Sequence, residues 1–165
     1  MAFKCENELE NFSFKDCQIN EISFSEKDII IEVEALIVLA ENSQNTNYTN
    51  SYADITKIVL KDAKILSGFK EGFKYYDADD KLLSEEPDTD LNDSEIKELI
   101  KKSSGAYLFG IKKHPVDTDF EYAFGLEFAD DSDYGSNVSD TYQLNISFSK
   151  ATISWDKYLN RVQEF

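Results

Sequence analysis

The chain has 165 residues, and its 33 Asp and Glu outnumber its 17 Lys and Arg, which gives a net charge of −16. This charge disfavours nucleic acids and anionic membranes as partners, because both bind cationic surfaces, and it favours a basic protein, a cation or no specific ligand. The length fits one domain over residues 1–165, and an acidic start without an apolar segment is not a signal peptide, so we expect a cytoplasmic protein.

Three short segments share one pattern, in which two alternating apolar residues precede a polar pair, a Cys or Ala, and an Ile two residues later. They are segments 12–19, 58–65 and 146–153. The alternation changes phase across the polar pair, as in a two-residue hairpin or in a β-bulge within one bent strand. Since Lys-Asp does not suit the positive φ angles of a tight hairpin, we favour a bulge at a corner. Cys17, Ala63 and Ala151 should then be buried at the bends.

Apolar residues at every second position predict strands with one face in the core and the other in water. In segment 29–39 the odd positions are apolar, and in segments 120–128 and 142–148 the even positions are apolar. These segments predict a mainly β fold, an antiparallel sandwich or partly open barrel of about eight strands with one short α-helix.

Three polar segments are predicted to be loops, namely 41–51, 77–95 and 130–140. Segment 77–95 carries nine acidic residues, and the last segment is also rich in Asp. Exposed carboxylates of this kind would meet the cationic groups of a basic protein partner. The candidate partner-binding residues are Asp77, Asp79, Asp80, Glu85, Glu86, Asp88 and Asp90, followed by Asp130, Asp131 and Asp133.

The acidic segment also contains the start of a calcium-loop pattern, with Asp88, Asp90 and Asn92 at the first, third and fifth positions. However, Asp93 stands where such a loop has its turn glycine, and Leu99 stands where it has a bidentate Glu. We therefore expect weak calcium binding or none, and we predict no metal site and no cofactor.

One helix is predicted over residues 93–103. Asn92 is a suitable N-cap, and Glu95, three residues later, completes a capping box. Ile96, Leu99 and Ile100 would form its apolar face, and Gly105 could end it.

No arrangement of residues indicates an enzyme. His114 is the only histidine, and we expect it in a solvated turn before Pro115. Cys5 and Cys17 are expected to be free thiols, because two cysteines without a signal peptide do not make a disulfide framework. Nucleophilic catalysis requires a nucleophile and a base brought together, and no spacing in the chain predicts this.

The second face of segment 120–128 is formed by Glu121, Ala123, Gly125 and Glu127, with small residues at its centre. Something flat could lie there, such as another strand, a helix or a ligand. The predicted helix is the simplest candidate, because it needs a surface for its apolar face.

Several short segments along the chain together carry a resemblance to a known group of proteins. They are Phe14-Lys-Asp16, Ile19, Ile22, 29–33, 58–60 and Ser154-Trp-Asp-Lys-Tyr158. The set covers about a quarter of the chain and resembles small uncharacterised bacterial β-rich proteins of the polymorphic-toxin immunity type. The resemblance implies a non-catalytic binding role and carries over no functional residue. Trp155, the only tryptophan, follows the apolar phase of the last strand, so we expect it in the core.

These observations lead to the hypothesis of a non-enzymatic acidic protein-binding module. Its most specific form is an immunity protein that blocks a basic toxin surface. The alternative is a small-molecule or carbohydrate-binding β domain that uses an aromatic-lined pocket. A deep aromatic cavity would favour the alternative.

Overall fold

The computed structural model of the protein describes residues 2–114, 121–128 and 140–161. These residues are mainly β, with 57% in strands and 9% in helices, and the strands pair antiparallel. The predicted fold class is confirmed, and of the two architectures considered the sandwich is the one observed. The described residues form sixteen strand segments instead of about eight, because sharp corners divide the longer segments and short strands appear in predicted loops.

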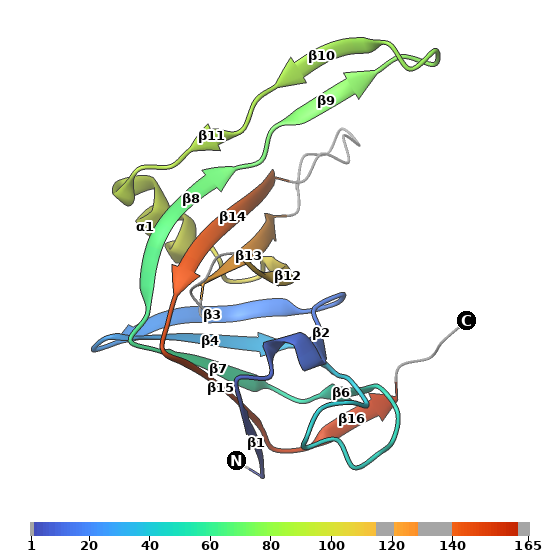
Figure 1. Ribbon diagram of the computed structural model, residues 1–165, viewed down its shortest axis with the longest axis vertical. Coiled ribbons are helices and arrows are strands. Elements are labelled where there is room, and N and C mark those ends of the chain that lie inside the picture. Colours follow the sequence, from blue (N-terminus) through green and yellow to red (C-terminus); the bar gives the residue numbers. More distant parts are fainter. Residues whose placement is uncertain (1, 115–120, 129–139, 162–165) are drawn as a thin grey trace.

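One ten-stranded sheet folds over on itself to make the body of the molecule (Figure 1). Its first half contains, from the edge inward, β1 (Phe3–Glu6), β15 (Lys150–Trp155), β7 (Thr56–Lys61), β4 (Asp28–Glu34) and β3 (Gln18–Ser25). Its second half continues with β12 (Tyr107–Lys113), β13 (Glu121–Phe128), β14 (Asp140–Ser147), β8 (Lys64–Lys70) and β11 (Thr89–Asp90). One register pair, Gln18 with Tyr107, joins β3 to β12. This narrow junction lets the halves fold toward each other.

The core lies between the two halves of the sheet. Ile29 and Ile31 of β4 line the same small internal void as Phe124 and Leu126 of β13, and all four side chains are buried. The predicted alternation is therefore confirmed for the described parts of these strands, whereas Phe120 lies outside the described residues. Further buried residues of the two halves are Ile19, Val33, Ile58, Leu60, Leu108, Leu144, Ile146, Ala151 and Ile153.

A second, four-stranded sheet covers one end of the body. It contains β16 (Tyr158–Arg161), β6 (Ser51–Ala53), β5 (Ile37–Val38) and β2 (Phe12–Ser13), and the 3-10 helix η1 (Leu9–Asn11) precedes β2. Trp155 is fully buried, as predicted, with the Phe3 ring stacked at 5.7 Å and the Phe12 ring edge-on at 5.8 Å between centroids. These aromatic contacts connect the two sheets.

The single strand predicted over residues 29–39 is wrong in its second half. The chain breaks at Ala35, which has a φ angle of +59°. β4 ends before this residue in the large sheet, and β5 follows it in the small sheet. Because both sheets cover this part of the chain, the three consecutive residues Leu36, Ile37 and Val38 are all buried, which no simple alternation describes.

The three segments with the shared pattern are corners at which the chain leaves one group of strands for another. Segment 12–19 passes from the small sheet to the large one, and segments 58–65 and 146–153 pass between the halves of the large sheet. The strands on either side of each corner do not pair with each other, so the alternative hairpin is wrong. The predicted bend at a sandwich corner is observed in segments 58–65 and 146–153, which stay paired with each other on both sides of the bend. The bend carries no bulge, because Lys61 pairs with Lys150 and Lys64 with Ser147, so equal numbers of residues lie in the two corners. The phase changes because each corner moves the chain to a differently oriented layer.

The last two corners lie side by side, because β7 pairs with β15 and β8 pairs with β14. The N–H of Ser149 in one corner donates to the carbonyl of Lys61 in the other at 2.8 Å. Cys17 and Ala151 are fully buried, as predicted, but Ala63 is only half-buried. It lies beside an open cleft instead of under a second layer.

The predicted helix is confirmed as α1 (Asp93–Lys101). The Asn92 side chain accepts the N–H of Glu95 at 2.8 Å, and the Glu95 carboxylate accepts the N–H of Asn92 at 3.1 Å, so the capping box is complete. The helix ends two residues earlier than predicted, with Lys102 as its C-cap, and Gly105 (φ +88°) lies in the link to β12. No helix among the described residues is long and apolar enough to cross a membrane.

The helix does not cover the small-residue face of β13, so that expectation is wrong. Ile96 and Ile100 of α1 join the core on the other face of the sheet, because this position completes the space between the two halves. On the small-residue face, the ring of Phe109 lies over Gly125, so close that a Cβ there would be 2.5 Å from the ring.

Candidate functional site

A β-hairpin projects from the body and carries much of the predicted acidic segment (Figure 1). Its strands β9 (Phe73–Tyr76) and β10 (Leu82–Glu86) form a separate two-stranded sheet and, within the described parts of the chain, pair only with each other. We call residues 73–86 the arm. The prediction of a loop over residues 77–95 is therefore wrong, since this range contains β10, β11 and the start of α1.

Asp77 organises the turn at the tip of the arm. Its carboxylate accepts the N–H groups of Asp79 at 2.8 Å and Lys81 at 2.9 Å, and its own N–H donates to the carbonyl of Lys81 at 2.9 Å. Asp80 adopts a φ angle of +60°, which Asp tolerates better than most residues. Asp77 is half-buried, and its carboxylate is occupied within the turn.

A close backbone contact forms the neck of the arm. The N–H of Gly72 donates to the carboxylate of Asp88 at 2.7 Å. A Cβ at position 72 would lie 1.9 Å from the carbonyl oxygen of Glu86, so only glycine fits between the two chains here. Asp88, like Asp77, therefore has a structural hydrogen bond within the arm or its neck.

The other predicted carboxylates of the arm region are exposed to solvent. They are Asp79, Asp80, Glu85, Glu86 and Asp90. Glu85 forms a cross-strand ion pair with Lys74 at 3.6 Å, and Asp90 lies in β11, where it pairs in register with Phe69. The remaining candidates, Asp130, Asp131 and Asp133, lie outside the described residues.

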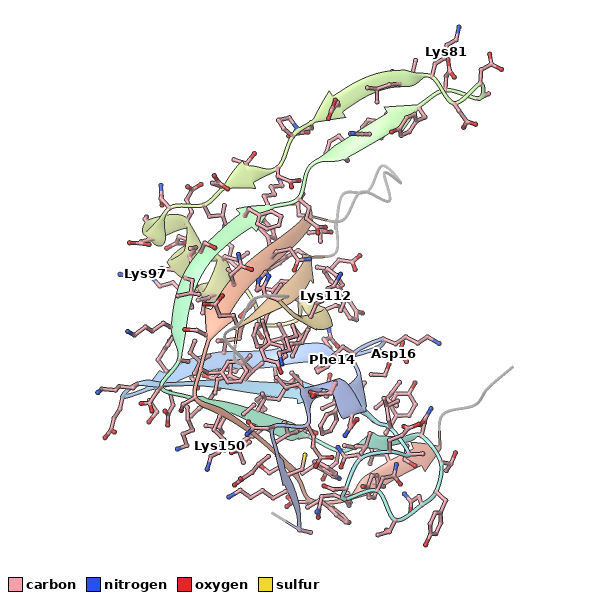
Figure 2. The ribbon with its side chains drawn as sticks, in the orientation of Figure 1. Phe14, Asp16, Lys81, Lys97, Lys112 and Lys150 are labelled. Carbon is pink, nitrogen blue, oxygen red and sulfur yellow. The ribbon has the colours of Figure 1, made fainter. Side chains whose placement is uncertain are left out.

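The arm also exposes a set of large apolar side chains that the sequence analysis missed. Their exposed fractions range from 37% to 68%, and they are Phe73, Tyr75, Tyr76, Leu82 and Leu83. The rings of Phe73 and Tyr75 meet edge to face at 4.9 Å on one face of the hairpin, and Tyr76 pairs with Leu82. Figure 2 shows side chains standing on both sides of the arm, with Lys81 at its tip. The aromatic residues at positions 73 and 75, two residues apart, are the sequence signal that could have indicated this strand.

No protein family, curated protein or solved structure matched this chain. The functional argument therefore depends on the geometry of the described residues.

The candidate catalytic groups occupy structural positions. His114 is half-buried and its Nε2 lies 2.6 Å from Oδ1 of Asn145, whose Nδ2 donates to Ser67 at 2.7 Å. It is therefore held by a side-chain network and is not the solvated turn residue that we expected. Burial raises the pKa of Cys5 and of Cys17 to about 12, so both remain protonated free thiols at neutral pH.

The calcium-loop pattern is not assembled in the structure. Asn92 caps α1, and Asp88 accepts the N–H of Gly72. Within the described parts of the chain, no three His, Cys, Asp or Glu side chains lie close enough together to hold a metal ion.

Proposed function

We propose that this protein is a non-enzymatic protein-binding module whose arm binds a basic protein partner. The observation that carries the proposal is the combination of exposed apolar side chains and exposed carboxylates on one projecting hairpin. A two-stranded hairpin is marginally stable in water on its own, and clustered exposed apolar groups are typical of interaction surfaces. A partner that covered Phe73, Tyr75 and Leu83 would stabilise the hairpin and remove these apolar side chains from water.

The charge of the arm region indicates the chemistry of that partner. Residues 73–90 contain seven carboxylates, all exposed except the half-buried Asp77, and two lysines. Exposed carboxylates of this kind raise the association rate with a Lys- and Arg-rich surface and select against acidic partners. The aromatic side chains would supply most of the affinity, because buried Tyr and Phe anchors dominate interface energies.

The resemblance to immunity proteins supports a more specific form of this proposal. In that form the partner is a toxin, and the carboxylates of the arm occupy a basic surface that otherwise meets phosphates or substrate. The two free buried thiols suit a reducing compartment such as the cytoplasm. A toxin gene next to the gene for this protein would support this form.

Affinity capture with wild type, an arm variant and a control variant tests the proposal. The arm variant carries Asp79→Asn, Asp80→Asn, Glu85→Gln and Glu86→Gln, and leaves the turn-forming Asp77 intact. The control variant neutralises four exposed carboxylates of the body, namely Glu10, Glu26, Glu34 and Glu41. We expect wild type and the control variant to retain one basic protein and the arm variant to lose it.

The control separates the arm from net charge, because both variants change the charge by the same amount. Equal capture by all three proteins would show that the arm carboxylates do not recognise the partner. Equal loss in both variants would assign the effect to overall charge instead of the arm.

A further inference from the structure

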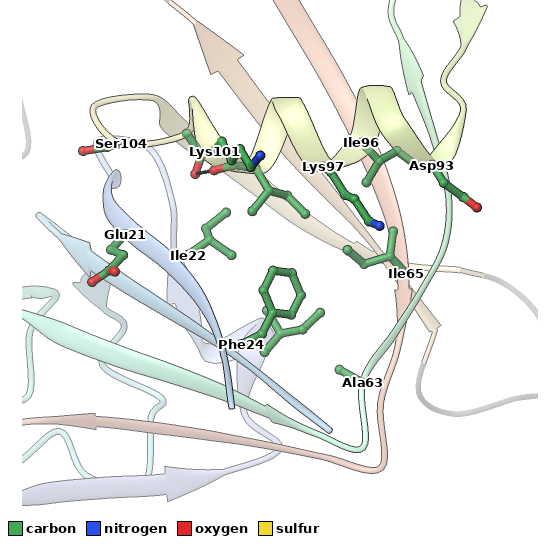
Figure 3. A pocket seen from close by; sticks show the side chains of 13 residues that line it. Glu21, Ile22, Phe24, Ala63, Ile65, Asp93, Ile96, Lys97, Lys101 and Ser104 are labelled. Atoms are coloured by element: carbon green, nitrogen blue, oxygen red, sulfur yellow. Dashed lines mark hydrogen bonds between the residues drawn. The ribbon is translucent and has the colours of Figure 1, made fainter. Parts of the chain in front are cut away.

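A second surface feature, a cavity, lies between elements other than the strands of the arm. It has a volume of about 740 Å³ and opens between α1, the strands β3 and β4, and the start of β8 (Figure 3). We call it the helix cleft. Its floor consists of apolar side chains, namely Ile22, Phe24, Ile29, Ile65, Ile96 and Ile100.

The floor is aliphatic and continues into the core. Ile22, Ile29, Ile65 and Ile100 also line the internal void of about 10 Å³ between the two halves of the sheet. Phe24 is the only aromatic side chain among the described residues that line the cleft. The site is therefore different from the aromatic-lined pocket that a sugar or a flat ring would favour, and it suits a flexible hydrocarbon chain.

One cation lies over this floor without a partner. In Figure 3 the side chain of Lys97 reaches down from α1 toward Ile65, and Lys97 forms no ion pair or hydrogen bond with any described residue. By contrast, Lys101 on the same rim lies 3.6 Å from Glu98. In a chain with almost twice as many acidic as basic residues, a lysine that forms no ion pair with a described residue is available for an anionic ligand.

Two acidic side chains mark the ends of the cleft. Asp93 lies at the first turn of α1 and points away from the floor, and Glu21 lies at the opposite end (Figure 3). Lys97 and Lys101 lie on the rim between these two carboxylates, and Lys97 is the one that forms no ion pair with a described residue. An anionic group of a ligand would be repelled from both ends and attracted to this part of the rim. The cleft thus combines an apolar floor with a cationic position at Lys97.

We propose that the helix cleft binds a linear aliphatic carboxylate, a fatty acid, with its acyl chain on the isoleucine floor and its carboxylate on Lys97. Each methylene that leaves water should strengthen binding by up to about four-fold. The charged hydrogen bond to Lys97 should favour the carboxylate over an uncharged head group. This proposal does not depend on the arm.

Calorimetric titration with octanoate, decanoate, dodecanoate and dodecan-1-ol, each below its micelle concentration, tests the proposal. We expect one site per chain, affinity that rises with chain length, and about ten-fold tighter binding of dodecanoate than of the alcohol. Lys97→Met should reduce this difference to about two-fold or less and leave the affinity for the alcohol unchanged. Lys102→Met, which removes the exposed side chain of the C-cap lysine of α1 outside the cleft, is the matched control.

A second variant tests the floor. Ala63 is half-buried at the edge of the cleft, so Ala63→Phe should fill part of the cavity and weaken every ligand at least ten-fold, while circular dichroism remains that of the folded protein. Three results would overturn the proposal: no binding of dodecanoate, several equivalent sites, or an unchanged preference for carboxylate in Lys97→Met. None of them bears on capture of a partner by the arm.

Discussion

Asparagine and glutamate side chains hold the irregular segment 41–51 in place. The amide of Asn45 donates to the carbonyls of Val38 and Leu39, each at 3.1 Å, and to that of Thr49 at 2.9 Å. Glu8 accepts the N–H of Ser43 at 3.0 Å and its hydroxyl. The Asn-rich composition that predicted a loop thus also supplies the hydrogen bonds that order it.

The pKa of Glu8 leads to a prediction about acid stability. Burial alone would raise this pKa, but the hydrogen bonds from Ser43 and Asn11 outweigh burial and hold the pKa below its ordinary value of 4.5. A folded-state pKa below the unfolded one contributes stability above pH 4.5, which is lost as the pH falls through the folded value. Glu8→Gln should therefore lower the free energy of unfolding by about 1–3 kcal/mol at pH 7.

Denaturant unfolding of wild type and Glu8→Gln between pH 7 and pH 3 measures this contribution. The difference between the two proteins should stay constant down to about pH 5 and shrink below it. Glu10→Gln, a change at an exposed neighbour, should have little effect at any pH. A difference that is equal at pH 7 and pH 3 would show that the charge of Glu8 is not involved.

Among the secondary-structure elements, the position of the arm depends on its neck. Gly72→Ala would place a Cβ against the backbone of Glu86, so the two chains must separate and the hydrogen bond from Gly72 to Asp88 must lengthen or break. We expect faster amide hydrogen exchange throughout the arm and unchanged exchange in the body. At Gly110 an added Cβ meets nothing within 4 Å, so Gly110→Ala is the control. Arm amides that exchange equally in both variants would contradict this description of the neck.

Local signals in the sequence located several elements correctly. Alternation identified β13 and β14, and the capping box identified the start of α1, because these patterns depend only on neighbouring residues. The break at Ala35 and the strands that the chain joins after each corner depend on which sheet covers which segment, and this packing is not encoded within a few residues. The arm was missed because the apolar alternation in β9 covers only Phe73 and Tyr75, and acidic residues surround it, so it is too short to stand out as a strand.

The candidate site was predicted only in part for the same reason. Acidic composition indicated Asp79, Asp80, Glu85 and Glu86 as exposed residues, and the structure places all four on the arm surface. The turn role of Asp77 requires knowledge of the β9–β10 pairing. The exposed aromatic side chains beside the carboxylates could be mistaken for core residues until that pairing was known.

At the scale of the whole molecule, the two proposed binding surfaces are separate. The arm extends from one end of the long axis, the small sheet lies toward the other end, and the helix cleft belongs to the body between them (Figure 1). The net charge of −16 acts over the whole surface and does not select a site by itself. The arm is distinguished because it adds exposed apolar groups to that charge.

The rate of association with the captured partner, measured by stopped flow from roughly 50 to 500 mM salt, tests the central claim most directly. If the arm recognises a basic surface, the wild-type rate should fall steeply as salt rises, because screening shortens the reach of exposed charges. The variant neutralised at Asp79, Asp80, Glu85 and Glu86 should associate more slowly at low salt and show a much weaker salt dependence, while the variant neutralised on the body should behave nearly like wild type. Equal rates and equal salt dependence for wild type and the arm variant would contradict the claim that the acidic arm binds the partner.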